Sequence, residues 1–397
     1  MKSASPFGPL LQFAGFALVT ALLYAVQRAL FADVKPVVNP YIQSIVISAG
    51  IAVILAVSLN LINGITGQFS LGHAGFMAVG AYTSAYFTKE IGGQLLNPLN
   101  FAVGILLGAL AAGLAGLIVG LPSLRLRGDY LAIVTLGFNQ IIISLIRNIE
   151  AVGGAAGYSG IDKFTSFAWV FALALACIWS VRNLAVSGLG RSMRAVRDDE
   201  IAAEAAGINT TRVKVIAFVY SAMWAGVAGA LQAHFIQTAN PGDFTFIRSV
   251  EVVVMVVLGG LGSITGSALS AVGLTVLQEQ LREVPIAFYT LVALVFVAFY
   301  WNLARLRAEK RADAGSLARA VAVPLALLAL MFAVYLYPLS RAFLESNKGA
   351  LRYVIYSLIL IVVMLLRPQG LLGRSEWSFA ALKRSKRIAP EPEGGLA

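Results

Sequence analysis

The chain has 397 residues, of which 59% are hydrophobic and only 12% charged, and its mean hydropathy is +0.82. Soluble domains average about 45–50% apolar and about 25% charged residues, so this composition excludes an ordinary globular enzyme and indicates a chain whose solvent is mostly lipid. Thirty Lys and Arg against 19 Asp and Glu give a net charge of +11. The basic residues lie between apolar runs, which favours a role in membrane orientation and predicts no nucleic-acid partner. One cysteine and two histidines exclude a disulfide framework and a metal site rich in either residue.

The first apolar run extends from Pro9 to about Leu30 and follows Lys2. A secretory signal would have a shorter apolar core followed by a cleavage site of small residues. Because this run is long and more apolar runs come after it, we interpret it as a retained membrane span.

The remaining apolar runs predict an all-α fold, a polytopic membrane bundle of about 10–12 transmembrane or re-entrant helices, since a bilayer core needs roughly 20 apolar residues per helix. The least secure pair is 249–261 and 265–280, because each run is short and a glycine-rich stretch separates them. This pair forms either a helical hairpin or one broken helix. The predicted spans lie near 8–31, 41–61, 72–88, 100–121, 130–147, 165–186, 214–235, 249–261, 265–280, 286–302, 320–338 and 351–366.

The distribution of basic residues predicts the orientation of these spans. With a hairpin at 249–280, both termini lie on the same side of the membrane. Segments on that side carry 19 Lys and Arg, and segments on the other side carry 7. Cytoplasmic loops are the ones enriched in basic residues, so we expect both termini in the cytoplasm.

Small residues recur at every fourth position in two predicted spans. They are Gly104, Gly108, Ala112, Gly116 and Gly120 in the first, and Ser221, Ala225, Gly229 and Ala233 in the second. This spacing puts them on one helix face, where a neighbouring backbone can approach closely. We interpret both stripes as helix packing; a sliding gate is the alternative.

The segment 60–73 is polar and rich in glycine although it lies between two spans. Transporters use unwound stretches of this kind to hold zwitterionic or anionic substrates near the midplane. The alternative is a short cytoplasmic turn that ends in a helix cap. We expect His73 to be a satisfied interfacial residue rather than a proton carrier.

A second glycine break, Gly259–Gly266, follows late in the chain, and Glu251 precedes it inside an apolar run. An intramembrane carboxylate is expected to face the bundle interior, where Glu251 contacts substrate or pairs with a basic residue on a neighbouring helix; at the interface it would be solvated. Two interrupted segments in opposite halves point to a central pathway. The candidate pathway residues are Asn60, Asn63, Gly67, Gln68, Ser70, His73, Glu251, Gly259, Gly260 and Gly262.

The segment 187–214 is charged and predicted to be cytoplasmic. It predicts a helix from about Arg191 to Ala206 that Gly207 ends, and Asn209 or Thr210 can cap the next span. By composition alone, a solvated spacer is the default interpretation of such a loop.

The sequence Glu204-Ala205-Ala206-Gly207 resembles the loop by which permeases of ABC importers insert a coupling helix into an ATPase. The chain resembles the branched-chain amino-acid ABC permease family in this loop and in four further motifs over most of 41–283 and 351–373. These motifs are Gly67–Phe76, Leu121–Tyr130, Gly259–Ser263 and Arg367–Gly373. The resemblance implies an ATPase-coupling loop made of Arg191, Arg194, Arg197, Asp198, Asp199, Glu200, Glu204, Ala205, Ala206 and Gly207.

The resemblance also implies the partners: a second permease subunit forming a heterodimer, two ATP-binding subunits, and a periplasmic or extracellular substrate-binding protein, all working in membrane lipid. The chain itself is expected not to be an enzyme, because a P-loop needs Gly-Lys followed by Ser or Thr and no lysine here follows a glycine. We therefore expect no cofactor on this chain and no metal site, with ATP and Mg used by the partner ATPases.

The implied cargo is a branched-chain or other small amino acid moved into the cytoplasm by alternating access. Three departures from the family pattern, Gln140, Val152 and Ser267, leave urea or short amides as alternatives. An ion-coupled secondary transporter is a further alternative. An intramembrane enzyme is disfavoured, since no metal cluster, His/Asp pair or nucleophile motif is visible in the sequence.

The motifs divide the chain into five parts. One of them, a two-span hairpin at 284–350, has no counterpart in the usual family pattern. Its basic loop suggests contact with lipid or a partner; the alternative is a peripheral hairpin without a function of its own. The parts are an N-terminal span and external loop at 1–40, a permease core at 41–283, the extra hairpin at 284–350, the last span with its Arg-Pro-Gln-Gly motif at 351–373, and a basic, disordered cytoplasmic tail at 374–397.

Overall fold

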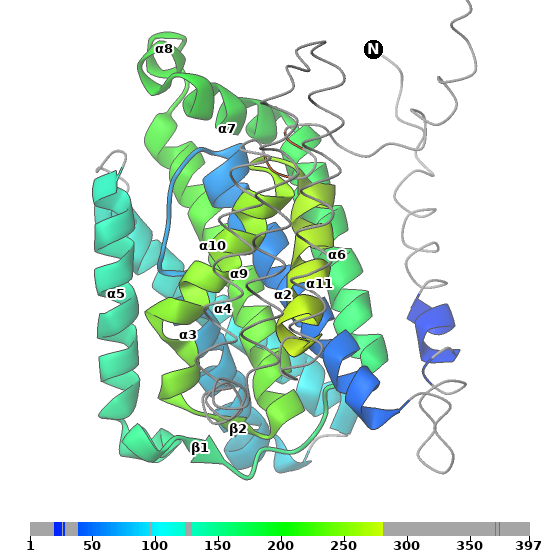
Figure 1. The fold of residues 1–397 in the computed structure, drawn as a ribbon. Coiled ribbons are helices and arrows are strands. Elements are labelled where there is room, and N and C mark those ends of the chain that lie inside the picture. Colours follow the sequence, from blue (N-terminus) through cyan, green and yellow to red (C-terminus); the bar gives the residue numbers. More distant parts are fainter. Residues whose placement is uncertain are drawn as a thin grey trace, which may run out of the picture. The chain divides into compact units, whose positions relative to one another are not determined.

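The computed structural model describes residues 20–25, 27, 39–94, 97–123, 129–280, 370 and 373. They belong to two compact units, Met1–Val272 with Gln369–Ala397, and Gly273–Pro368. The first unit contains nearly all the described elements, and Figure 1 labels the α-helices and strands among them. Most of the predicted first span, the predicted spans at 286–302, 320–338 and 351–366, the extra hairpin and the tail lie outside the described residues.

The described elements are almost all helical, which confirms the predicted fold class. The α-helices are α2 (Pro40–Asn60), α3 (His73–Tyr86), α4 (Asn97–Ser123), α5 (Asp129–Arg147), α6 (Phe167–Val186), α7 (Gly188–Asp198), α8 (Glu200–Ala205), α9 (Thr210–Ile236), α10 (Phe246–Gly259) and α11 (Ile264–Gln280). Two π-helical turns, η1 (Leu61–Ile65) and η2 (Phe87–Ile91), extend α2 and α3, and four 3-10 turns are η3 (Gly92–Gln94), η4 (Glu150–Val152), η5 (Gly154–Ala156) and η6 (Pro241–Phe244).

Within the described part, five helices are long and apolar enough to cross a membrane. They are Pro40–Ile65, Asn97–Pro122, Tyr130–Arg147, Phe167–Val186 and Thr210–Ile236. Each matches a span predicted from an apolar run. The run near 72–88 is also helical, as α3 followed by η2.

The centre of the bundle is formed by α3, α4 and α9, which touch through small residues. A β-carbon added to Gly226 of α9 would lie 2.5 Å from the β-carbon of Ala112 and 2.7 Å from the carbonyl oxygen of Gly108, both on α4. A β-carbon added to Gly80 of α3 would strike the backbone of Gly226. Missing side chains therefore let three backbones meet, as the packing interpretation of the small-residue stripes predicts. Gly80 and Gly226 were not in the predicted stripes.

The insecure pair at 249–280 is a hairpin, so the alternative of one broken helix is wrong. Gly259 of α10 and Gly266 of α11 are in backbone contact, and the hydroxyl of Ser270 donates to the carbonyl of Met255. These two contacts pair residues in antiparallel order. With 14 and 17 residues, α10 and α11 rise about 21 and 25 Å, less than the ~30 Å of a hydrocarbon core.

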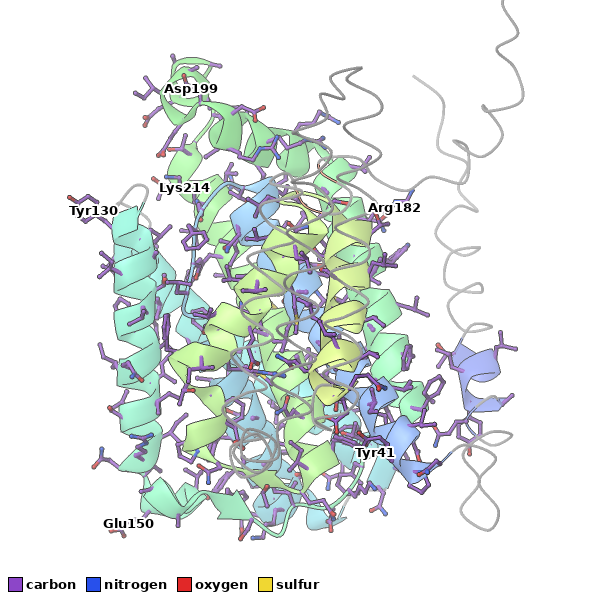
Figure 2. The ribbon with its side chains drawn as sticks, in the orientation of Figure 1. Tyr41, Tyr130, Glu150, Arg182, Asp199 and Lys214 are labelled. Atoms are coloured by element: carbon purple, nitrogen blue, oxygen red, sulfur yellow. The ribbon has the colours of Figure 1, made fainter. Side chains whose placement is uncertain are left out.

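A two-stranded sheet lies at one end of the bundle (Figure 1), the end where Figure 2 labels Glu150. Strand β1 (Tyr158–Ser159) pairs with β2 (Thr238–Ala239) in antiparallel order. The ammonium of Lys89 lies 4.6 Å from the ring centre of Tyr158, and the hydroxyl of Tyr158 donates to Glu90 at 2.8 Å. Burial and this hydrogen bond raise the pKa of Tyr158. The strands were not predicted, because each has only two residues.

Candidate functional site

The segment predicted to couple to an ATPase lies at the opposite end of the bundle, where Figure 2 labels Asp199 and Lys214. It contains two helices, so the prediction of one helix over Arg191–Ala206 is wrong. Asp199 has an extended backbone, with φ −158° and ψ 112°, and its carboxylate accepts hydrogen bonds from the amides of Ile201 (2.9 Å) and Ala202 (3.0 Å). Because Asp at a helix N-cap satisfies amides that have no partner within the helix, Asp199 ends α7 and starts α8.

The end of α8 follows the prediction. Gly207 has φ +82°, in the left-handed region that glycine favours, and the amide of Ile208 donates to the carbonyl of Ala203 at 3.0 Å. Asn209 then caps α9 by accepting from the amide of Arg212 at 2.9 Å. An ion pair of 2.6 Å between Lys214 and Glu200 joins α9 to α8.

The two helices present their charged residues to solvent while Met193, Val196 and Ala203 are buried against the bundle. Ile201 is 68% exposed on α8, and the sequence analysis missed it because a single isoleucine in a charged loop carries no periodic signal. Of the predicted coupling residues, Arg197 and Glu200 are half-buried, and Arg191, Arg194, Asp198, Asp199, Glu204, Ala205, Ala206 and Gly207 are exposed.

The first glycine break is a non-helical stretch that is buried in part, with Gly67 and Phe69 exposed; a role in holding substrate stays a prediction. After η1 the chain is non-helical until His73, yet Thr66, Gln68 and Ser70 are buried. The amide of Ser70 donates to the side chain of Asn63 at 3.1 Å. Non-helical backbone is tolerated at such depth where protein groups satisfy it.

Side chains from other helices satisfy the backbone around the start of α3. The hydroxyl of Thr135 on α5 accepts from the amide of Leu71 at 3.0 Å, and the hydroxyl of Ser249 on α10 accepts from the amide of Ala74 at 3.1 Å. Neither residue was predicted as functional, since a single hydroxyl in an apolar run is common. The position of the start of α3 therefore depends on α5 and α10, two helices that lie far from it in the sequence.

The second glycine break forms the tight tip of the α10–α11 hairpin. Gly260 and Gly262 have φ +109° and +93°, values that residues with side chains rarely adopt. Asn60, at the end of α2, joins this tip to the first break. Its side-chain oxygen accepts from the amide of Gly262 at 2.9 Å and its side-chain nitrogen donates to the carbonyl of Ser263 at 3.0 Å.

We call the group formed by Asn60, Gly64, Gly260 and Gly262 the glycine junction. A β-carbon on Gly64 would strike the backbone amide of Gly262 and the side chain of Asn60. Gly370 also reaches the junction, because a β-carbon there would lie 2.6 Å from the Gly260 α-carbon. The junction therefore brings together three segments that are far apart in the sequence: the end of α2 with η1, the tip of the α10–α11 hairpin, and Gly370.

The coupling segment also contacts the glycine junction, through Arg197 of α7. Its Nη1 donates to the carbonyl of Gly64 at 3.1 Å, and a β-carbon on Gly262 would lie 3.2 Å from the same nitrogen. Gly67 packs on the aliphatic part of the side chain, since a β-carbon there would lie 2.5 Å from the Arg197 Cγ.

Two predicted pathway residues lie away from the junction. His73 is buried, and its Nε2 lies 2.9 Å from the hydroxyl oxygen of Ser58. Glu251 pairs with Arg248 at 3.0 Å, so its basic partner is on its own helix and not on a neighbouring one. It precedes Gly259 by about 12 Å of helix rise.

Two buried side-chain amides have no hydrogen-bond partner among the described residues. They belong to Gln68, in the unwound stretch, and to Asn139 of α5. A β-carbon added to Gly75, in the first turn of α3, would lie 2.8 Å from the side-chain oxygen of Asn139. A buried polar group without a partner costs free energy. Each of these two amides could therefore form hydrogen bonds with a bound polar solute.

Comparison with known proteins gives one matching family model, described as the permease component of branched-chain amino acid transport systems, over residues 41–364. The high-affinity branched-chain amino acid transport system permease protein LivM of Escherichia coli is 37% identical over 268 residues, 59% of this chain and 62% of that protein. The chain therefore spans less than two thirds of LivM.

Two further relatives are more distant. LivH of Escherichia coli, a permease protein of the same-named system, is 28% identical over 54% of this chain and 76% of its own length. The ribose import permease protein RbsC of Haemophilus influenzae is 24% identical over 62% of this chain and 79% of its own length. No solved structure matches the chain.

Proposed function

The chain belongs to the family of permease components of branched-chain amino acid transport systems, and from this premise we propose that it is the membrane-spanning permease subunit of an ATP-driven importer. The single observation that carries the proposal is the α7–α8 segment. Its inner side is buried against the bundle, and its outer side exposes Ile201 and Glu204 at one end of the bundle. We infer that this end faces the cytoplasm, as the excess of basic residues there predicts.

The proposed partner of the α7–α8 segment is a pair of ATP-binding subunits, which would use ATP and Mg on behalf of this chain. The relatives LivM and LivH are both permease proteins of a high-affinity branched-chain amino acid transport system, which supports a second permease subunit as a further partner. A soluble substrate-binding protein would deliver the solute at the opposite end, in keeping with a bacterial inner-membrane importer.

The proposed cargo is a branched-chain or other small amino acid, with urea, short amides or another small polar solute as the alternative. The unwound stretch supports a polar cargo, because Gln68 is buried there and its amide lacks a partner among the described residues. An amide offers both a donor and an acceptor, which suits the carboxylate and ammonium groups of a zwitterion. The ribose relative RbsC is too distant to argue for a sugar.

Replacing Ile201 with aspartate is expected to weaken binding of the ATPase subunits about 30-fold, the equivalent of ~2 kcal/mol, because the variant loses an apolar contact and buries a carboxylate without a partner in the interface. Glu204→Arg is expected to act in the same direction. The measurement is the affinity of the ATPase subunits for the permease in lipid nanodiscs.

The matched control is Ile149→Asp, which changes an isoleucine that is 48% exposed beyond the far end of α5. This variant is expected to bind the ATPase subunits normally. If Ile201→Asp and Glu204→Arg bind them as tightly as this control does, the docking proposal is wrong.

A further inference from the structure

The guanidinium of Arg197 lies between its own helix and the first glycine break. Its Nε and Nη2 donate to the carboxylate of Asp198 at 3.2 and 3.0 Å, while Nη1 donates to the carbonyl of Gly64 at 3.1 Å. A planar guanidinium can hold both partners at once because its donors point in fixed directions. The Asp198 carboxylate thereby orients the fork toward Gly64.

The carbonyl of Gly64 is a suitable acceptor for a hydrogen bond from the positively charged guanidinium of Arg197. Gly64 lies in the last turn of the helix formed by α2 and η1, where carbonyls lack partners within the helix and carry the negative end of the helix dipole. A hydrogen bond from a charged donor is also stronger than one between neutral groups. Arg197 therefore stabilises the end of α2 at the point where the chain unwinds.

The second glycine break also contacts Arg197, and it is hydrogen-bonded to Asn60 at the end of α2. Gly262 packs beside the Arg197 Nη1, and its amide donates to Asn60 at 2.9 Å. A β-carbon at Gly67 would strike Arg197, 2.5 Å from its Cγ, and one at Gly262 would lie 3.2 Å from its Nη1. A β-carbon at Gly64 would instead strike Asn60 and the backbone of Gly262. A displacement of α7 would thus either move the glycine junction or break the hydrogen bond between Arg197 and Gly64.

We propose that Arg197 is a positioning residue that transmits movement of the α7–α8 segment to both glycine breaks at once. This inference rests on the proposed docking of ATPase subunits at α7–α8, because docking supplies the movement. Arg197 itself lies on the inner side of the segment, so its role is separate from binding the ATPase. Coupling of this kind needs a contact that has two arrangements, and a single charged hydrogen bond to an unwound helix end is one that can switch.

The test compares Arg197→Ala, Arg197→Lys and the control Arg182→Ala, which changes an exposed arginine near the end of α6, outside the α7–α8 segment. The complete importer is reconstituted in proteoliposomes, and ATPase binding, ATP hydrolysis and uptake of labelled leucine, urea and acetamide are measured together. Arg197→Ala is expected to keep ATPase binding and ATP hydrolysis but to reduce solute imported per ATP about tenfold, the effect of losing one hydrogen bond to a charged group. Arg197→Lys is expected to restore only part of the loss, since a point charge lacks the fork.

A second readout uses the permease chain in nanodiscs and does not depend on its partners. Hydrogen exchange of amides in 61–72 and 259–264 is expected to rise about tenfold in Arg197→Ala and to stay unchanged in Arg182→Ala. An increase confined to α7 would overturn the proposal, as would normal import per ATP. Failure of the proposed function would look different, because the unmodified chain would then bind no ATPase subunit while the exchange result still decides the role of Arg197.

Discussion

Replacing Gly226 with leucine is expected to prevent accumulation of folded protein in the membrane. Gly226 lies where α9 meets α3 and α4, and the atoms nearest to an added β-carbon belong to Ala112 and to the backbone of Gly108 and Ala109. Backbone cannot move aside as a flexible side chain can, so the helices would have to separate. Overpacking typically costs about 1–3 kcal/mol, and we expect a loss beyond about 3 kcal/mol here.

The measurement is the amount of monodisperse protein extracted from membranes, together with its melting temperature in detergent. Gly137→Leu is the matched control, because Gly137 is also a glycine within a membrane-spanning helix but has nothing within 4 Å of its added β-carbon. That variant is expected to accumulate and melt like the unmodified chain. Equal behaviour of the two variants would contradict the close packing of the three helices.

Replacing Asn60 with leucine is expected to reduce transport at least about tenfold while the protein still folds. Leucine has a similarly branched side chain, but it leaves the amide of Gly262 and the carbonyl of Ser263 buried without their partner. Each unsatisfied group costs about 1–3 kcal/mol. The tip of the α10–α11 hairpin would then detach from α2, so the two glycine breaks would no longer move together.

Uptake by the reconstituted importer and hydrogen exchange of Gly262 check this expectation. Asn148→Leu is the control, since Asn148 makes one side-chain hydrogen bond, to a carbonyl of its own helix, and is exposed. It is expected to transport normally. An Asn60→Leu protein that transports at the control rate would show that the junction between the breaks has no part in transport.

The membrane helices could be predicted from the sequence because their length and apolar composition are local properties. The runs near 41–61, 100–121 and 165–186 become α2, α4 and α6 with ends shifted by a few residues. The end of α8 at Gly207 was predictable for the same reason, since a left-handed backbone favours glycine. The small-residue stripes predicted close packing but not its partners.

The candidate site could be predicted only in pieces, because its contacts join residues far apart in the chain. Asn60 and Gly262 are separated by 202 positions and Arg197 and Gly64 by 133, and no local pattern reveals either pair. The helix break at Asp199 was missed because three acidic residues in a row, Asp198, Asp199 and Glu200, also suit the interior of a charged helix. Glu251 was predicted to pair with a basic residue on a neighbouring helix, but its partner is Arg248, one turn away on the same helix.

The central claim is that this chain is the permease of an ATP-driven importer, and uptake by proteoliposomes that contain the complete importer tests it most directly. Labelled leucine, urea and acetamide are supplied with the binding protein, and ion gradients are collapsed with ionophores while ATP is kept inside. The account predicts that uptake of one of these solutes requires ATP, survives the loss of the gradients and falls in Ile201→Asp. Uptake that proceeds without ATP and stops when the gradients collapse would contradict it and favour an ion-coupled transporter.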